Sequence, residues 1–465
     1  MPDPDVVLLS RIQFALTIAF HYLYPPLSIG LGVFLVVVEG LFLKTGDPLW
    51  RQVARFWTRV FALTFALGVA TGLVMEFEFG TNWSRYSRFV GDVFGSALAA
   101  EGIFAFFLES GFLALLLFGW DLLPPRVHFF STLMVCLGAH FSAIWIVVAN
   151  SWMQTPAGYH VVSGPSGPRA EIVDFWAMVF NPSSVIRLTH TVLGAWLAGA
   201  FLVLSVSAWY LLRRKHERFA LASMRVAVAF ALVTCLLQVW AGHESATVVA
   251  RHQPVKFAAL EGHFKTGPAD LSVVGWVDEQ AQTVRGLSIP GGASLMLYGD
   301  RSKSVPGLLE VAASDRPPIQ PTFQSYHLMV GIGFALLALA VVTAVAAWRN
   351  RLQHSRALLW ALVISVLGPQ IANQAGWMAA EVGRQPWIVQ GLMRTAEGVS
   401  PILTSSQVIF SLVLFTVIYM LLFAVFIYLL NDKIQHGPDP VETQGALALL
   451  PGRLIDVLQQ RKGEA

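Results

Sequence analysis

The chain has few charged residues and few cysteines, and both shortages exclude broad classes. Asp, Glu, Lys and Arg make up 13% of its 465 residues, about half the share of an ordinary soluble protein, so we do not expect a soluble enzyme. The net charge is only +3, and the basic residues form short clusters between apolar runs, which argues against nucleic acid as a partner. Cys136 and Cys235 each lie within an apolar run, so we expect two small core residues and neither a disulfide nor a CxxC metal site.

The sequence also lacks a cleavable secretory signal, internal repeats and low-complexity tracts. Residues 1–5 are acidic where such a signal would be basic, and no small-residue cleavage site interrupts the apolar run that follows. We therefore expect the first helix to remain part of the protein.

Long apolar runs are abundant. Hydrophobic residues make up 55% of the chain and the mean hydropathy is +0.61, and a helix of about 20 residues is long enough to span a bilayer. The sequence therefore predicts an all-α polytopic membrane protein with nine transmembrane helices. The expected spans are 14–42, 56–79, 93–119, 127–150, 186–212, 219–243, 325–348, 357–381 and 405–430.

The basic residues gather in alternate connections and in the C-terminal tail, all on one side of the predicted bundle. The positive-inside rule makes that side cytoplasmic, so the N-terminus is expected outside and the C-terminus in the cytoplasm. These residues are Lys44, Arg51, Arg55, Arg59, Arg126, Arg213, Arg214, Lys215, Arg218, Arg349, Arg351 and Arg356 in the connections, and Lys433, Arg453, Arg461 and Lys462 in the tail.

Two outward connections are long, residues 151–185 and residues 244–324. A long loop inside a compact protein is usually functional or disordered, and we interpret 244–324 as a binding loop on the outer face. The expected organisation is helices 1 to 6 over 1–243, the outer loop 244–324, helices 7 to 9 over 325–430 and a cytoplasmic tail over 431–465.

An ionisable cluster closes the eighth apolar run. Glu381 and Arg384 stand three residues apart on neighbouring helical positions, so they can pair or share a bound group, and Pro386 then ends the helix. The sequence leaves two interpretations open: a functional site, or an interfacial ion pair with Trp377 and Trp387 as headgroup anchors.

Other polar side chains lie inside the predicted spans, where they are costly and often functional. Glu101 and Glu109 are separated by about 80° around a helix, roughly one stripe, and Ser142 lies in the next span. The two carboxylates could ligate iron or carry protons, or they could face polar groups of another subunit.

Histidine and methionine are the common axial donors to haem iron. His190 and Met329 lie on different spans and could form a six-coordinate site, while His21 would suit a five-coordinate haem open to a gas. Each alone has a simpler interpretation, since a buried Met is usually core filler and a membrane His usually bonds a carbonyl. We expect His140 to be such a satisfied core histidine. His327 is left as either a haem-propionate partner or a packing residue.

Several motifs in order carry a family resemblance from about residue 8 to 430. The chain resembles subunit I of cytochrome bd ubiquinol oxidase. The matching segments are Arg11-Ile12-Gln13-Phe14 with His21, Met75 to Trp83, Glu101-Gly102 with Phe107 to Ser110, Asn150 to Gln154, and Gly383-Arg384-Gln385-Pro386-Trp387.

The resemblance implies oxidation of membrane quinol and four-electron reduction of dioxygen to water, with three haems in this subunit. His190 and Met329 match the ligands of the low-spin haem b. His21, Glu101 and Glu381 match the residues around the high-spin haem b and the third haem, which is haem d or a further haem b. The resemblance also implies that Trp377 stands between haems and that Arg384 lies near a propionate.

The outer loop resembles the family's quinol-binding segment at Gln253 to Glu261, with Lys256 and Glu261 as the matched polar residues. A cation and a carboxylate five residues apart can bond a quinol hydroxyl and take its protons. The loop lacks the family's optional long insertion, as in cyanide-insensitive oxidases. One departure is His327, which stands two residues before Met329 where some members carry an arginine.

The resemblance further implies protons taken from the cytoplasm through Glu109, Ser142 and Glu101, charge separation without a pump, and a bacterial inner-membrane location. Expected partners are a smaller membrane subunit II, with or without a single-helix subunit, together with quinol, dioxygen and lipid.

Without the resemblance, the residues alone leave two other classes of function open. In a transporter or channel, the carboxylates would form an ion path, and a haem-b electron carrier would never bind oxygen.

Overall fold

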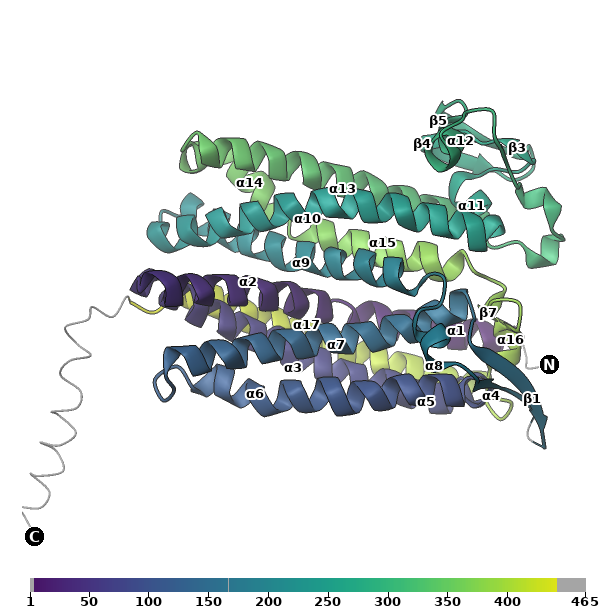
Figure 1. The fold of residues 1–465 in the computed structure, drawn as a ribbon, viewed down its shortest axis with the longest axis horizontal. Helices are drawn as coiled ribbons and strands as arrows, with labels where there is room; N and C mark the ends of the chain where they lie inside the picture. The colour runs from purple at the N-terminus through teal and green to yellow at the C-terminus, as the bar shows by residue number, and fades with distance from the viewer. Residues whose placement is uncertain (1–3, 166, 441–465) are drawn as a thin grey trace, which may run out of the picture.

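The computed structural model describes residues 4–165 and 167–440. Nine helical segments in this part of the chain are long and apolar enough to cross a membrane, which confirms the predicted number (Figure 1). They are α1 (Pro4–His21) with α2 (Pro25–Thr45), α3 (Pro48–Thr81), α5 (Gly91–Ala100) with the π-helix η1 (Glu101–Phe106) and α6 (Phe107–Phe118), α7 (Pro125–Gln154), α9 (Ser184–Leu212), α10 (Glu217–His252), α13 (Ile319–Trp348), α14 (Arg356–Ile364) with α15 (Leu367–Val382), and α17 (Ser405–His436).

The first span differs from its predicted bounds of 14–42. Its helix begins at Pro4 and is interrupted at residues 22–24, between α1 and α2. The break precedes Pro25 and Pro26, which have no backbone N–H to donate to carbonyls of the preceding turn. Irregular backbone at membrane depth is tolerated where protein covers it, and Tyr24 in the break is fully buried. His21 therefore ends a helix in the interior of the bundle.

Two other spans are also discontinuous. The third changes from α-helix to π-helix at Glu101, and the eighth is interrupted at residues 365–366, between α14 and α15. Single π-turns within α-helices occur frequently at functional sites. Both interruptions lie in spans that carry predicted site residues.

The chain is mostly helical, as expected, and the two long connections between its spans are folded and add short strands. Short strands in polar connections escape an analysis based on long apolar runs. Residues 151–185 contain a hairpin of β1 (Tyr159–Gly164) and β2 (Gly167–Ile172), then α8 (Phe175–Val179). The second connection contains α11 (Pro254–Glu261), β3 (Gly267–Pro268) paired with β6 (Ser304–Val305), β4 (Leu271–Asp278) paired with β5 (Thr283–Ile289), α12 (Gly292–Tyr298), η2 (Leu308–Glu310) and η3 (Ala313–Asp315).

Smaller elements complete the described chain. They are α4 (Ser84–Phe89), η4 (Leu352–His354), the β7 (Trp387–Val389) and β8 (Met393–Arg394) pair, and α16 (Thr395–Gly398).

The molecule has two distinct ends (Figure 1). The β-strands, α8, α11 and the N-terminus lie at one end, and the connections that carry most basic residues lie at the other. Arg51, Arg55 and Arg59 lie on the first turns of α3 rather than in a loop, and they pair with Asp121 and Asp439. Arg453, Arg461 and Lys462 of the predicted tail lie outside the described residues.

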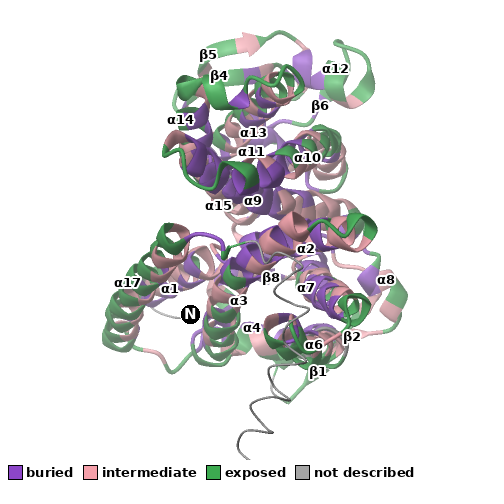
Figure 2. Cartoon of the chain, turned by 90° about the vertical axis from the view of Figure 1, so that its left-hand side faces the viewer, coloured by how far each residue is buried: buried purple, intermediate pink, exposed green. Residues whose placement is uncertain are grey.

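Helix α9 is the most buried span and lies at the centre of the bundle (Figure 2). A Cβ on Gly199 would lie 2.4 Å from the backbone of Gly30, so glycine at both positions allows α2 and α9 to cross closely. Helix α17 is the opposite case, because its outward face is exposed and apolar. Cys136 and Cys235 are buried and unpaired, which confirms their prediction as core residues.

Candidate functional site

A group of polar side chains meets around Glu381, at the C-terminus of α15 and at the end of the bundle that is expected to face outward. Arg384 donates to Glu381 Oε2 from Nε at 2.7 Å and from Nη2 at 2.5 Å, which confirms the predicted pair. Asn150 Nδ2 and Gln154 Nε2, from the last turns of α7, each donate to Glu381 Oε1 at 3.2 Å. We name Glu381, Arg384, Asn150 and Gln154, with Arg187 and Lys256, the outer polar cluster.

Lys256 joins this cluster to the outer loop. Its Nζ donates to Gln154 Oε1 at 2.9 Å, and the side chain is only 4% exposed. Helix α11 can approach so closely because residue 383 is glycine, where a Cβ would lie 3.2 Å from Lys256 Cγ. Burial holds the pKa of Lys256 well below its ordinary value, and the positive charge of Arg187 lowers it further. Burial thus favours the neutral form of the Lys256 amine over its charged form.

Arg187 is a site residue that the sequence reading did not identify. It donates to Asn150 Oδ1, and to Ser151 Oγ at 3.2 Å. The available signal was an arginine inside an apolar helix, three residues before His190. With Arg187 and Arg384 the cluster holds two guanidinium groups for one carboxylate, and buried charges need partners. An anionic group such as a haem propionate fits this excess.

Trp377, on α15, lies between the neighbours of two predicted haem ligands, His21 and His190. Its ring meets Tyr22, the neighbour of His21, edge to face at a centroid distance of 5.5 Å. The guanidinium carbon of Arg187 lies 5.9 Å from the centroid of the same ring. The indole thus contacts the residue next to His21 on one side and a residue one turn from His190 on the other.

His21 lies at the break between α1 and α2. Thr71 donates its hydroxyl proton to Leu67 O at 2.7 Å, so its oxygen accepts a hydrogen bond from His21 Nδ1 at 3.0 Å. That bond fixes the tautomer and leaves the Nε2 lone pair available for coordination. The neighbouring Gly72 also leaves room, since a Cβ there would lie 3.2 Å from the ring.

His190 and Met329 lie on helices of one four-helix group, in which α9 packs on α10 and α15, and α13 packs on α10 and α15. Gln238 Nε2 lies 3.3 Å from each ring nitrogen of His190, and the buried Gln238 Oε1 has no hydrogen-bond partner among the described residues. A Cβ at Gly376 would lie 2.7 Å from Met329 Sδ. An imidazole and a thioether on opposite helices, with glycine beside the sulfur, fit a six-coordinate haem.

The predicted iron donors are single side chains on separate helices. In the part of the chain that the structure describes, no three His, Cys, Asp or Glu side chains are grouped to hold a metal ion. A porphyrin iron needs only one or two axial donors from the protein, and single donors of this kind are what the bundle supplies.

Glu101, Ser142 and Glu109 lie in the third and fourth spans. Ser142 Oγ donates to Glu101 Oε1 at 2.5 Å, and Glu109 is 8% exposed and close enough to Glu101 to interact electrostatically. The π-turns of η1 change the angle per residue, so the predicted separation of 80° does not hold. The structure therefore brings the three residues together by a different route from the one expected.

Glu261 and Lys256 have different partners. Glu261 is 4% exposed and accepts from the backbone N–H of Ser272 at 3.3 Å. Burial raises the pKa of Glu261 to about 7, and the Ser272 hydrogen bond opposes part of that increase. Within the described residues the two side chains share no hydrogen bond, so a common substrate would have to reach both.

His140 and His327 each have protein atoms within hydrogen-bond distance of both ring nitrogens. His140 Nδ1 donates to Cys136 O at 2.7 Å and Nε2 accepts from Trp196 at 2.9 Å, which confirms a satisfied core histidine. His327 Nε2 lies 2.9 Å from Ser272 O and Nδ1 lies 2.8 Å from Phe323 O. His327 therefore links the helix that carries Met329 to the strand that contacts Glu261.

Comparison with known proteins supports one family. Residues 9–438 match the family model described as cytochrome bd terminal oxidase subunit I. The chain is 38% identical to cytochrome bd ubiquinol oxidase subunit 1 of Bacillus subtilis strain 168, over 93% of this chain and 94% of that protein. It is 35% identical to cytochrome bd-II ubiquinol oxidase subunit 1 of Escherichia coli K12, over 95% and 98%.

A solved structure agrees with these sequence relatives. A chain of the bd oxidase from Geobacillus thermodenitrificans superimposes with a TM-score of 0.88 at 30% identity, over 94% of this chain and 100% of the other. The resemblance seen in the motifs therefore extends over the entire helical bundle, and the chain belongs to the cytochrome bd terminal oxidase subunit I family.

Proposed function

We propose that this protein is the haem-bearing subunit of a terminal respiratory oxidase, a quinol:oxygen oxidoreductase. The carrying observation is the outer polar cluster. It connects Lys256, in the segment that resembles the quinol site, through Gln154 to Glu381 in two hydrogen bonds. The names of the relatives, which are ubiquinol and menaquinol oxidase subunits, support the same activity.

In this proposal the outer loop binds ubiquinol or menaquinol. Glu261 and Lys256 take its two hydroxyl protons: the pKa of Glu261 is raised to about 7, and the pKa of Lys256 is lowered by burial. Their separate partners suit a quinol whose two hydroxyls are on opposite edges of the ring.

His190 and Met329 hold a low-spin haem b, and His21, Glu101 and Glu381 surround a high-spin haem b and a third haem, either haem d or a further haem b. These haems supply one-electron transfer and an open iron position for oxygen. Arg384 and Arg187 neutralise propionates, and the indole of Trp377 separates the two haem regions. The tautomer that Thr71 imposes on His21 supports the assignment of His21 as a ligand.

The arginines and lysines of the basic end support a cytoplasmic position for that end, with quinol oxidised at the opposite, outer face. The third span runs toward the basic end through η1 and then α6. Glu109 in α6 is therefore nearer to the basic end than Glu101 in η1. Protons for water formation pass through Glu109, Ser142 and Glu101. Electrons and protons arriving from opposite faces separate charge without a pump.

The protein resides in a bacterial inner membrane beside a smaller subunit II, with or without a single-helix subunit. Apolar side chains on the outward face of α17 support contact with lipid or another helix. Examples are Phe410, Met420, Leu421 and Tyr428, each more than 60% exposed.

Oxygen consumption by the purified complex tests the proposal. Reduced quinol should drive oxygen uptake, and a reduced-minus-oxidised spectrum should show haem b together with a high-spin species that binds carbon monoxide. A colourless complex would instead indicate a transporter, and a low-spin complex without oxygen uptake would indicate an electron carrier.

The pH dependence of quinol oxidation tests Glu261. Only the ionised carboxylate accepts a proton, so the rate should rise with pH through about 7 and level off above it. Glu261→Gln should remove that inflection and slow the reaction above pH 7 by at least about tenfold. Glu279→Gln, an exposed change in the same loop, is the matched control. An unchanged inflection in Glu261→Gln would assign the proton acceptor elsewhere.

Replacement of Glu109 tests the proton path. Glu109→Gln keeps the side-chain shape but cannot carry a proton, so steady-state oxygen reduction should slow by about a hundredfold. Reduction of the haems by quinol should stay fast, which stopped-flow absorbance can separate from the slow step. Unchanged turnover would remove Glu109 from the path.

A further inference from the structure

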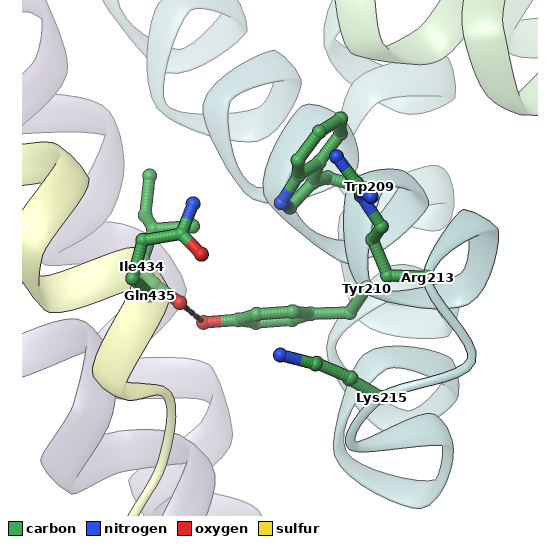
Figure 3. A pocket seen from close by; sticks show the side chains of 6 residues that line it. All are labelled: Trp209, Tyr210, Arg213, Lys215, Ile434 and Gln435. Carbon is green, nitrogen blue, oxygen red and sulfur yellow. Dashed lines mark hydrogen bonds between the residues drawn. The ribbon is translucent and has the colours of Figure 1, made fainter.

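A cavity of about 200 Å³ lies at the basic end between the C-terminal turns of α9 and α17, away from the outer polar cluster. Its lining combines aromatic rings and cations: Trp209, Tyr210, Arg213, Lys215, Ile434 and Gln435 (Figure 3). No carboxylate of the described residues lines it. We infer that this cavity binds the phosphate headgroup of an anionic membrane phospholipid.

The floor of the cavity is fixed. Tyr210 is 2% exposed and donates its hydroxyl proton to Ile434 O at 2.7 Å, so the ring bridges α9 and α17 (Figure 3). The guanidinium carbon of Arg213 lies 4.4 Å from the centroid of the Trp209 ring. The aromatic walls therefore have defined positions before any ligand arrives.

The turn that carries the cations is also fixed by hydrogen bonds. Lys215 N donates to Tyr210 O at 2.9 Å, and Arg213 N donates to Trp209 O at 3.1 Å. His216 adopts a left-handed φ of 49° and packs edge to face on Tyr210 at 5.2 Å. A loop held in this way positions the two basic side chains at little further entropic cost.

Charge argues for an anionic ligand. Neither Arg213 nor Lys215 forms an ion pair with any described residue, whereas Arg51, Arg55 and Arg59 at the same end all pair with aspartates. Two cations beside one cavity, with no carboxylate partner among residues 4–165 and 167–440, attract phosphate, and guanidinium binds it in a bidentate manner.

The position of the cavity at the expected headgroup level of the membrane favours a lipid over a soluble ion. Trp209 meets Trp360 of α14 at a centroid distance of 6.2 Å, and Trp360 is 47% exposed beside the apolar surface of the bundle. Tryptophans at helix ends mark the headgroup level of a membrane, and basic pockets between helices on the cytoplasmic side suit anionic headgroups.

Binding of short-chain phosphatidylglycerol to the purified holo-complex tests the inference, with short-chain phosphatidylcholine and inorganic phosphate as parallel probes in native mass spectrometry. The complex should prefer phosphatidylglycerol. The double variant Arg213→Gln with Lys215→Gln should bind it about thirtyfold more weakly, since each cation near the surface is worth about 1 kcal/mol and 1.4 kcal/mol is tenfold.

The matched control is Arg214→Asn with Arg218→Gln, which removes two charges from the same end but none from the cavity lining. Asparagine is chosen at residue 214 because it tolerates the left-handed φ of 55° found there. The control should keep the preference. Equal losses in both double variants would show diffuse surface attraction and overturn the site. Competition by inorganic phosphate as strong as by the lipid would overturn the lipid assignment, and no preference in the wild-type complex would overturn the whole inference.

Discussion

His190→Ala should remove the low-spin haem absorbance and reduce quinol-driven oxygen uptake by more than about a hundredfold, because even second-shell changes at metal sites cost 10–100-fold. Carbon monoxide binding at the high-spin site should persist, since His21 lies on a different helix at the break after α1. The reduced-minus-oxidised spectrum and carbon monoxide difference spectrum of the purified complex measure both effects.

His140→Ala is the matched control, because His140 is also a partly buried histidine within a span but both of its ring nitrogens are satisfied by protein groups. It should keep all haems. Gly376→Ala provides an independent test if His190→Ala fails to assemble. Its Cβ would lie 2.7 Å from Met329 Sδ, so the thioether must move and the potential of the low-spin haem should fall. A normal low-spin spectrum and potential in both variants would rule out this ligand pair.

The spans could be predicted because lipid imposes one simple requirement. About 20 apolar residues must follow one another for a helix to cross the membrane, and nine such runs are visible in the sequence. The pairing of Glu381 with Arg384 was also predictable, since residues three apart on a helix are neighbours. Local geometry was sufficient in both cases.

The interruptions in the spans were not predictable from apolar length. Pro25 gave a signal for the break after His21, but the run of hydrophobic residues on both sides concealed it. The change to π-helix at Glu101 has no proline at all, and it altered the expected angle between Glu101 and Glu109. Strand pairs such as β4 and β5 were missed because they lie in mixed, polar connections without a long apolar pattern.

The assembly of the outer polar cluster depends on non-local packing. Gln154, Arg187 and Lys256 come from three different helices. They gather around Glu381 because α7 ends, and α9 and α11 begin, at the same end of the bundle. No spacing in the sequence links these positions. Motif resemblance placed Lys256 and Glu381 in separate functional roles, whereas the hydrogen bonds through Gln154 connect them directly.

Glu381→Ala should cause the largest loss at that cluster. It removes the one carboxylate that faces Arg384, Asn150 and Gln154, and it leaves the buried guanidinium of Arg384 without that partner, where an uncompensated buried charge costs up to about 3–5 kcal/mol. We expect a less stable complex that has lost one high-spin haem. Extracted-haem chromatography and thermal denaturation of the purified complex measure the two effects.

Glu381→Gln separates charge from shape, because the amide fills the same space and can still accept from Asn150 and Gln154 but leaves the guanidinium of Arg384 without an anion. It should therefore keep most of the packing yet lose the same haem signal. Glu279→Ala, an exposed carboxylate at the same end, should change neither haem content nor stability. If Glu381→Gln retained every haem, haem binding would not require the negative charge of this carboxylate, and the role of the cluster would be confined to joining α7, α11 and α15.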